Sequence, residues 1–194
     1  MTDVLLFHHA QGLTAGVRAL AERMRAAGHV VTAPDLFDGA TFDTVEAGVA
    51  HARAIGFDAV AERGRAVAET LTSELVYVGW SLGVMSAQAL AQTRPGARGA
   101  VLMESCLPAE AFGGPWPSGV ALQVHGMDAD PIFAGEGDLD AARELVASVP
   151  GAELFTYPGD VHLFADHGLA TYDETAATVL VGRVLGFLAD LTPS

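Results

Sequence analysis

Short apolar runs of strand length alternate with segments of mostly helical period along this chain, and this alternation most limits the folds open to it. A helix between two strands returns the chain so that the strands run parallel. Parallel strands buried on both faces read as continuous apolar runs, as these do. The sequence therefore predicts an α/β fold with a mostly parallel sheet and helices on both faces. The six runs occupy residues 4–8, 30–33, 75–78, 99–103, 120–125 and 153–157.

The segments between these runs carry helical signals. Leu13, Val17, Leu20 and Met24 form one apolar stripe, and Gly28 follows where a left-handed helix cap is favoured. Similar stripes run through residues 84–90, 141–149 and 172–191.

Residues 42–71 are helical in character but are interrupted by Gly48, Gly56 and Gly64. One interpretation is a partly mobile flap over a site. The favoured one is two surface helices joined at a glycine.

The composition is that of a soluble globular protein. The 194 residues are 51% apolar and 18% charged, which suffices for a sizeable core, so we expect one domain over residues 1–194. The formal net charge of −14 opposes nucleic-acid phosphates and anionic membrane surfaces. We therefore expect a small-molecule substrate, no nucleic-acid or membrane partner, and a monomer or homodimer.

Residue usage also limits the chemistry. All ten basic residues are arginine, which excludes a lysine Schiff base, a phosphate-loop lysine and a serine-lysine dyad. Cys106 is the one cysteine, so no internal disulfide or cysteine-cluster metal site can form. The chain starts without a basic leader or a long apolar segment. These features predict a cytoplasmic protein.

Residues 79–83 read Gly-Trp-Ser-Leu-Gly between an apolar run and an Ala-rich helical stretch. Strand, sharp turn with a central serine, and helix together form the pattern of a nucleophile elbow. Glycine two residues to either side lets strand and helix approach closely, and the serine hydroxyl is exposed above the sheet edge. Ser81 is the candidate nucleophile.

The partners of this serine are expected on loops at the carboxyl ends of other strands. Asp128 and Asp130 follow the fifth apolar run, and His162 follows the sixth. The order serine, acid, histidine is that of α/β-hydrolases. His162 would take the proton of Ser81, and Asp130 or Asp128 would hold the other ring nitrogen.

Asp160, Asp166 and His167 also offer metal ligands, but the five-residue spacing from His162 to His167 puts the two rings off a shared helical face, so we expect no metal site. We also expect no cofactor. An oxyanion requires two backbone N–H donors, which we assign to Leu82 and to Ala10 in the loop after the first strand.

Four segments together resemble the dienelactone hydrolase family over nearly the whole chain. They are the elbow at 79–83 and residues 27–37, 125–133 and 157–168. The resemblance implies a three-layer α/β-hydrolase fold with no large cap domain. Matching the Asp-Pro pair of the third segment favours Asp130 as the triad acid.

The chain departs from the family pattern at three positions. Ser81 stands where family enzymes acting on dienelactone usually have cysteine, His9 where they often have glutamate, and Asp166 where they commonly have arginine. These departures disfavour an anionic lactone, although Arg53 or Arg63 would be able to substitute for the missing cation.

The sequence thus predicts a cofactor-free serine hydrolase of small esters, lactones or thioesters with Ser81, Asp130 and His162 as its triad. The alternatives are an acyltransferase with the same triad, a non-catalytic hydrolase-like binding protein, and a flavodoxin-like nucleotide binder, which the missing lysine disfavours. The expected substrate-binding residues are His9, Trp80, Trp116, Phe133 and Phe164.

Overall fold

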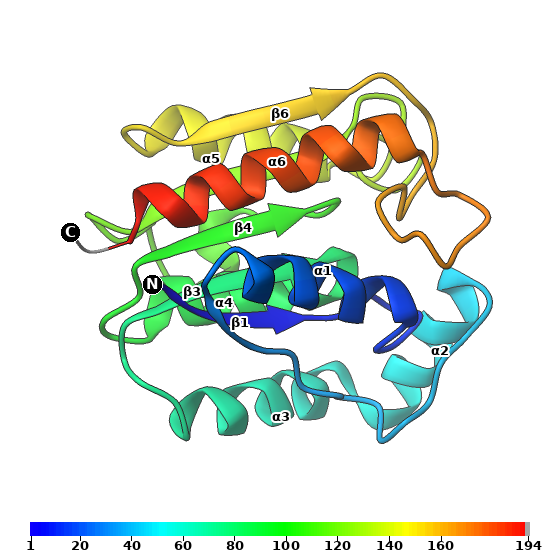
Figure 1. Ribbon diagram of the computed structural model, residues 1–194, viewed down its shortest axis with the longest axis horizontal. Helices are drawn as coiled ribbons and strands as arrows, with labels where there is room; N and C mark the ends of the chain where they lie inside the picture. Colours follow the sequence, from blue (N-terminus) through cyan, green and yellow to red (C-terminus); the bar gives the residue numbers. More distant parts are fainter. Residues whose placement is uncertain (193–194) are drawn as a thin grey trace.

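The computed structural model describes residues 1–192 and contains one six-stranded parallel sheet (Figure 1). The strands lie in the order β2-β1-β3-β4-β5-β6. Their bounds are β1 Asp3–Phe7, β2 Val30–Thr32, β3 Leu75–Trp80, β4 Gly99–Met103, β5 Ala121–Met127 and β6 Glu153–Tyr157. All six predicted strands are present, and the main differences are that β3 and β5 each extend two residues further than the apolar runs.

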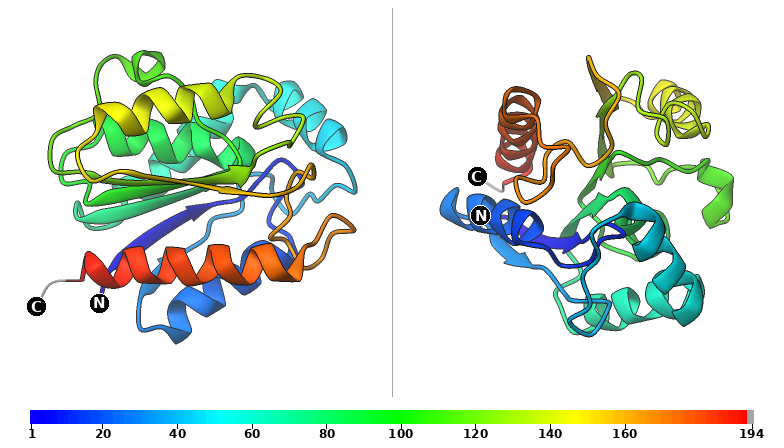
Figure 2. Two further views of the ribbon diagram at one scale, coloured as in Figure 1. Left: turned by 90° about the horizontal axis from the view of Figure 1, so that it is seen from above. Right: turned by 90° about the vertical axis from the view of Figure 1, so that its right-hand side faces the viewer.

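Helices cover both faces of this sheet, as the alternation of strands and helices predicts. The α-helices are α1 Ala15–Ala26, α2 Val45–Ile55, α3 Phe57–Glu69, α4 Val84–Thr93, α5 Asp138–Ser148 and α6 Glu174–Asp190, and two short 3-10 helices are η1 Ser81–Gly83 and η2 Ala109–Phe112. Figure 2 shows α1 and α6 on one side of the sheet and α4 and α5 on the other. The result is a three-layer α/β-hydrolase fold without a large cap domain in the described part of the chain.

The core is divided by the sheet because alternate strand residues point to opposite faces. Along β3, Leu75 and Tyr77 pack with α3, α4 and α5, whereas Val76, Val78 and Trp80 pack with α1 and α6. This alternation decides which side chains reach each side of the sheet edge.

Residues 42–71 form α2 and α3, which meet at Gly56, a residue with φ of 96°. Thr44 caps the start of α2 by accepting a hydrogen bond from the N–H of Ala47. The favoured interpretation, two helices with a glycine joint, describes the segment. Within residues 1–192, no helix is both long and apolar enough to cross a membrane.

Candidate active site

Ser81 lies at the turn between β3 and α4 with a left-handed φ of 50°. The glycines on either side are required by close packing. A Cβ on Gly79 would lie 2.6 Å from the Cα of Val84, and a Cβ on Gly83 would lie 2.7 Å from the backbone oxygen of His8. Strand, helix and the end of β1 therefore meet at the serine, as a nucleophile elbow requires.

The structure brings the three predicted triad side chains together. Ser81 Oγ lies 2.8 Å from His162 Nε2, and His162 Nδ1 lies 2.6 Å from Asp130 Oδ2. Because a carboxylate only accepts hydrogen bonds, Nδ1 carries the imidazole proton and the lone pair of Nε2 faces the hydroxyl of Ser81. The other carboxylate oxygen, Asp130 Oδ1, accepts from the backbone N–H of Ile132 at 2.8 Å.

The surroundings of His162 favour its charged form. Burial lowers the pKa of His162, but the hydrogen bond to Asp130 and the negative charges of Glu104, Asp130 and Asp138 outweigh burial and hold the pKa above its ordinary value. An imidazole in this setting can accept a proton from Ser81 and be stabilised once it has done so.

The two candidate acids lie in different positions. Asp130 is fully buried beside His162, whereas Asp128 is exposed and accepts a hydrogen bond at 3.2 Å from the N–H of Gly159. Asp128 thus joins the loop after β5 to the loop after β6, and Asp130 is the carboxylate that contacts the imidazole.

A hollow of about 530 Å³ lies beside Ser81. Both residues expected to provide oxyanion donors, Ala10 and Leu82, line it together with the serine. Within residues 1–192, no backbone oxygen accepts a hydrogen bond from the N–H of Ala10. The remaining lining residues are Val45, Glu46, Val49, Arg53, Met85, Glu104, Ser105, Leu107, Ile132, Glu136 and Asp138.

The loop that carries Ala10 is held against α2. Gly48 packs on the backbone oxygen of Ala10 so closely that a Cβ there would collide with it. Gln11 adds two hydrogen bonds to Phe42, one from its side-chain Nε2 at 2.8 Å and one accepted by its backbone oxygen at 3.1 Å. These contacts fix the position of the Ala10 N–H relative to Ser81.

The expectation that His9 and Trp80 line the substrate pocket is not met. Trp80 is fully buried on the α1 and α6 side of the sheet, because it is the last residue of β3 and its phase along the strand turns it away from the hollow. Trp80 instead lines a separate hollow of about 260 Å³ between α1 and α6. His9 is also fully buried and packs edge-on against Trp80 at 5.1 Å between ring centroids.

The other three aromatic residues are not in the hollow either. Trp116 lies at the amino end of β5, at the opposite edge of the sheet, and its indole N–H donates to the backbone oxygen of Val120 at 2.7 Å. Phe133 packs in the core against Gly126 and Phe164 against Tyr157, and both are fully buried. The apolar lining of the hollow is aliphatic instead.

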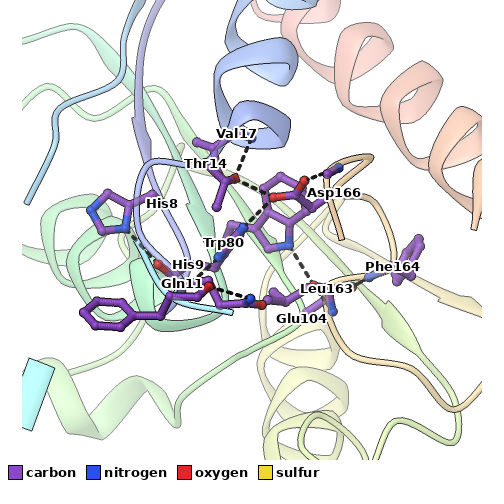
Figure 3. A network of polar contacts seen from close by, with 12 residues as sticks. His8, His9, Gln11, Thr14, Val17, Trp80, Glu104, Leu163, Phe164 and Asp166 are labelled. Carbon is purple, nitrogen blue, oxygen red and sulfur yellow. Dashed lines mark hydrogen bonds and ion pairs between the residues drawn. The ribbon is translucent and has the colours of Figure 1, made fainter. Parts of the chain in front are cut away.

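His9 and Asp166 form a second buried histidine-carboxylate pair (Figure 3). The Gln11 N–H donates to His9 Nδ1, so Nε2 carries the proton and donates to Asp166 Oδ2 at 2.9 Å. Burial lowers the pKa of His9 more than the contact with Asp166 raises it, which keeps the ring neutral. Thr14 also donates to Asp166, at 2.5 Å. The pair ties the loop after β1 to the loop that follows His162.

The two arginines considered as substrate ligands lie in different places. Arg63 donates to the backbone oxygen of Leu36 and pairs with Asp38, outside the hollow. Arg53 is exposed on α2 and is the one basic residue among the described residues that line the hollow.

Two other polar side chains near this edge, His125 and Asp166, form hydrogen bonds within the protein. His125 lies in β5, where Tyr157 donates to its Nδ1 and its Nε2 donates to Gln123. Asp166 is engaged by His9, as described above. In the stretch covered by the structure, no three His, Cys, Asp or Glu side chains are grouped so as to hold a metal ion.

Glu104 is the residue that sequence reasoning missed. It directly follows β4, is fully buried, and lines the hollow with Ser81. The rule that residues after parallel strands form the site points to this position, but the sequence does not show that the glutamate is buried between two loops.

Comparison with known proteins places the chain in a family. The sequence model of the dienelactone hydrolase family matches residues 1–192. No curated protein matches the chain significantly.

Many solved structures share the fold. A Klebsiella pneumoniae protein described as a candidate dienelactone hydrolase is 18% identical, with a TM-score of 0.77 over 97% of this chain and 87% of its own. A dienelactone hydrolase-like promiscuous phosphotriesterase from metagenomic libraries is 21% identical, with a TM-score of 0.67 over 98% of this chain and 87% of its own. A pyrethroid hydrolase from Sphingobium faniae is 15% identical, with a TM-score of 0.58 over 97% of this chain and 99% of its own.

The likeness to these structures shows the fold, and the family match over residues 1–192 shows the relationship. This chain belongs to the dienelactone hydrolase family, a family of hydrolases with the α/β-hydrolase fold.

Proposed function

We propose that this hydrolase cleaves a small ester, lactone or thioester through an acyl-enzyme on Ser81. The observation that supports the proposal is the continuous chain of hydrogen bonds from Ser81 through His162 to Asp130, with steps of 2.8 and 2.6 Å, beside an open hollow. A serine hydroxyl is protonated at neutral pH and requires such a base to become a nucleophile.

In the first half of the reaction, Ser81 Oγ bonds to the carbonyl carbon while its proton passes to His162 Nε2. The carbonyl oxygen becomes an oxyanion held by the N–H groups of Leu82 and Ala10. The bond from carbon to the leaving oxygen or sulfur then breaks, and the proton on Nε2 goes to that atom. The acyl group remains on Ser81 as an ester.

In the second half, water replaces the leaving group. His162 takes a proton from the water as its oxygen bonds to the acyl carbon, and the second tetrahedral intermediate forms in the same oxyanion site. The bond to Ser81 Oγ breaks, Oγ regains the proton from Nε2, and a carboxylic acid is released. Asp130 holds the imidazole throughout and stabilises its charged form.

The hollow favours a small and uncharged acyl compound. Its volume of about 530 Å³ is within the usual range for small-molecule sites. The aliphatic side chains of Val49, Met85 and Ile132 supply apolar surface, and the lining carries more carboxyl groups than basic groups. An anionic acyl group would meet this negative charge with Arg53 as its one favourable partner.

Hydrolysis of a short-chain nitrophenyl ester by the wild-type protein, Ser81→Ala and Ser118→Ala tests the proposal. Ser118 is an exposed serine at the far edge of the sheet and serves as the matched control. We expect Ser81→Ala to lose more than about 1,000-fold in kcat and Ser118→Ala to match the wild type. A fluorophosphonate probe should add covalently to Ser81 alone. Equal activity of Ser81→Ala and the wild type would refute the assignment.

A further inference from the structure

Glu104 is a buried carboxyl group between the two loops that carry the nucleophile and the base. It follows the last residue of β4, is 0% exposed, and has a left-handed φ of 59°. A non-glycine residue in this conformation is strained. Glycine or asparagine would adopt the turn more easily, so the glutamate side chain must supply something that the backbone conformation does not.

The carboxyl group accepts three N–H hydrogen bonds, which come from both sides of the site (Figure 3). The indole N–H of Trp80, the residue before Ser81, donates to Glu104 Oε2 at 2.7 Å. The backbone N–H groups of residues 163 and 164, which follow His162, donate to Oε2 and Oε1 at 3.0 Å each. The Glu104 side chain thus joins the nucleophile elbow to the loop that carries His162.

The hydrogen bonds to Glu104 and the nearby imidazole of His162 both favour the ionised form of its carboxyl group. Three N–H donors match an acceptor-only carboxylate, and a protonated carboxyl group would have to turn its O–H toward one of them. Burial is only partly offset by the nearby imidazole of His162 and the N–H donors, and the net effect raises the pKa of Glu104 to about 7. In return, the negative charge of Glu104 raises the pKa of His162.

Three other titratable groups act on Glu104 or His162. Asp130 and Asp138 also raise the pKa of His162, and Asp130 opposes ionisation of Glu104. His9 interacts with His162 from the other side and has its own pKa lowered by burial, so it stays neutral. Glu104 differs from the other carboxylates because it accepts hydrogen bonds from both loops, from the Trp80 indole before Ser81 and from two backbone N–H groups after His162.

We propose that Glu104 is a positioning residue that keeps Ser81 and His162 within hydrogen-bonding distance of each other through its contacts with Trp80 and residues 163–164. Its negative charge also stabilises the imidazolium formed during acyl transfer. This inference rests on the proposed serine hydrolase function. It assigns Glu104 no contact with the reacting atoms.

The main test is the pH dependence of ester hydrolysis by Glu104→Gln. Glutamine keeps the size and one acceptor oxygen, but it removes the charge and presents an NH₂ group to one of the donors. Without the charge the pKa of His162 falls, so the base stays neutral to lower pH. We expect the acid limb of kcat/KM to move down by about one pH unit. We also expect kcat to fall about tenfold with KM changed less than about twofold, because the lost interaction acts on the transition state.

Two further variants complete the design. Trp80→Phe keeps an aromatic ring but removes the indole N–H that lowers the pKa of Glu104. Glu104 is then less ionised near neutral pH, so we expect a shift of the acid limb in the same direction by about half a unit. Glu144→Gln makes the same chemical change as Glu104→Gln on an exposed position of α5 and should match the wild type. If Glu104→Gln does not fold, Trp80→Phe decides the question.

The possible failures are distinguishable. Acid limbs that stay within about 0.2 pH units of the wild type in the folded variants would overturn the role of Glu104 while leaving Ser81 hydrolysis intact. A wild-type protein that neither hydrolyses esters nor labels at Ser81 would overturn the proposed function and this inference with it.

Discussion

Replacement of Asp130 by asparagine should remove the base from Ser81 without changing the shape of the site. Asp130 Oδ1 accepts the Ile132 N–H at 2.8 Å, so the amide oxygen of an asparagine would be held there. Its NH₂ group would then face His162 Nδ1, which lies 2.6 Å from the other oxygen of Asp130. A neutral imidazole must accept at Nδ1 and therefore carries its proton on Nε2, toward Ser81.

The expected cost follows from that change of tautomer. In a serine protease triad the same replacement lowers kcat about 10⁴-fold, which corresponds to about 5.5 kcal/mol of activation free energy. The assay is kcat/KM for a nitrophenyl ester at neutral pH, with unfolding midpoints measured to show that the variant is folded.

Asp128→Asn is the matched control for this variant, since Asp128 is exposed on the same loop and does not contact His162. We expect it to retain activity within about twofold. A folded Asp130→Asn protein that keeps more than about a tenth of wild-type activity, or an equal loss in Asp128→Asn, would refute the tautomer argument.

Three other changes have defined outcomes. Gly83→Ala would place a Cβ 2.7 Å from the backbone oxygen of His8, so denaturant titration should show a loss of about 1–3 kcal/mol in unfolding free energy. Arg53→Ala should raise KM for a carboxylate-bearing nitrophenyl ester about threefold and leave KM for a neutral ester unchanged, because Arg53 is the basic residue of the hollow. Burial lowers the pKa of His125 to about 3, so below the ordinary value of 6.5 the unfolded chain binds a proton that the folded chain does not. Acidification from pH 6.5 to about 4 should therefore cost the wild type about 3 kcal/mol more unfolding free energy than His125→Gln, measured by urea titration of both.

The arrangement of the site could be predicted from the sequence because the fold converts order along the chain into position. Parallel strands joined by helices place every strand-to-helix loop at one edge, so residues that directly follow strands become neighbours. Ser81, Asp130 and His162 each follow a strand in this way, and hydrogen-bond distances join them. The elbow pattern added the requirement for glycine on either side of Ser81, which the close packing of Gly79 explains.

The lining of the pocket could not be predicted in the same way. An aromatic residue near the motif indicates burial, but the face on which it is buried depends on where the strand ends. β3 continues through Trp80, and that extension of two residues turns the indole toward α1 and α6. Similarly, the chain between β4 and β5 returns to the far edge of the sheet before Trp116, so proximity in sequence to the site residues carried no information.

Glu104 was missed for a related reason. Its donors from the loop after His162 lie 59 and 60 positions away in sequence, and a single glutamate after an apolar run has the pattern of an ordinary exposed loop residue. Only the assembled sheet brings the two loops around it and removes it from water.

Backbone strain at this edge links these observations. Four non-glycine residues in the described part of the chain have positive φ, and three of them are Ser81, Glu104 and Leu163. At roughly 1–3 kcal/mol each, three such residues cost about 3–9 kcal/mol, which is comparable to the whole stability of a typical domain. Contacts that exist only in the folded state must offset this cost, and the Leu163 N–H bond to Glu104 together with the tight packing of the two elbow glycines are such contacts. Residue propensities alone would have disfavoured all three conformations, so the strained positions are those where tertiary packing overrides the local sequence.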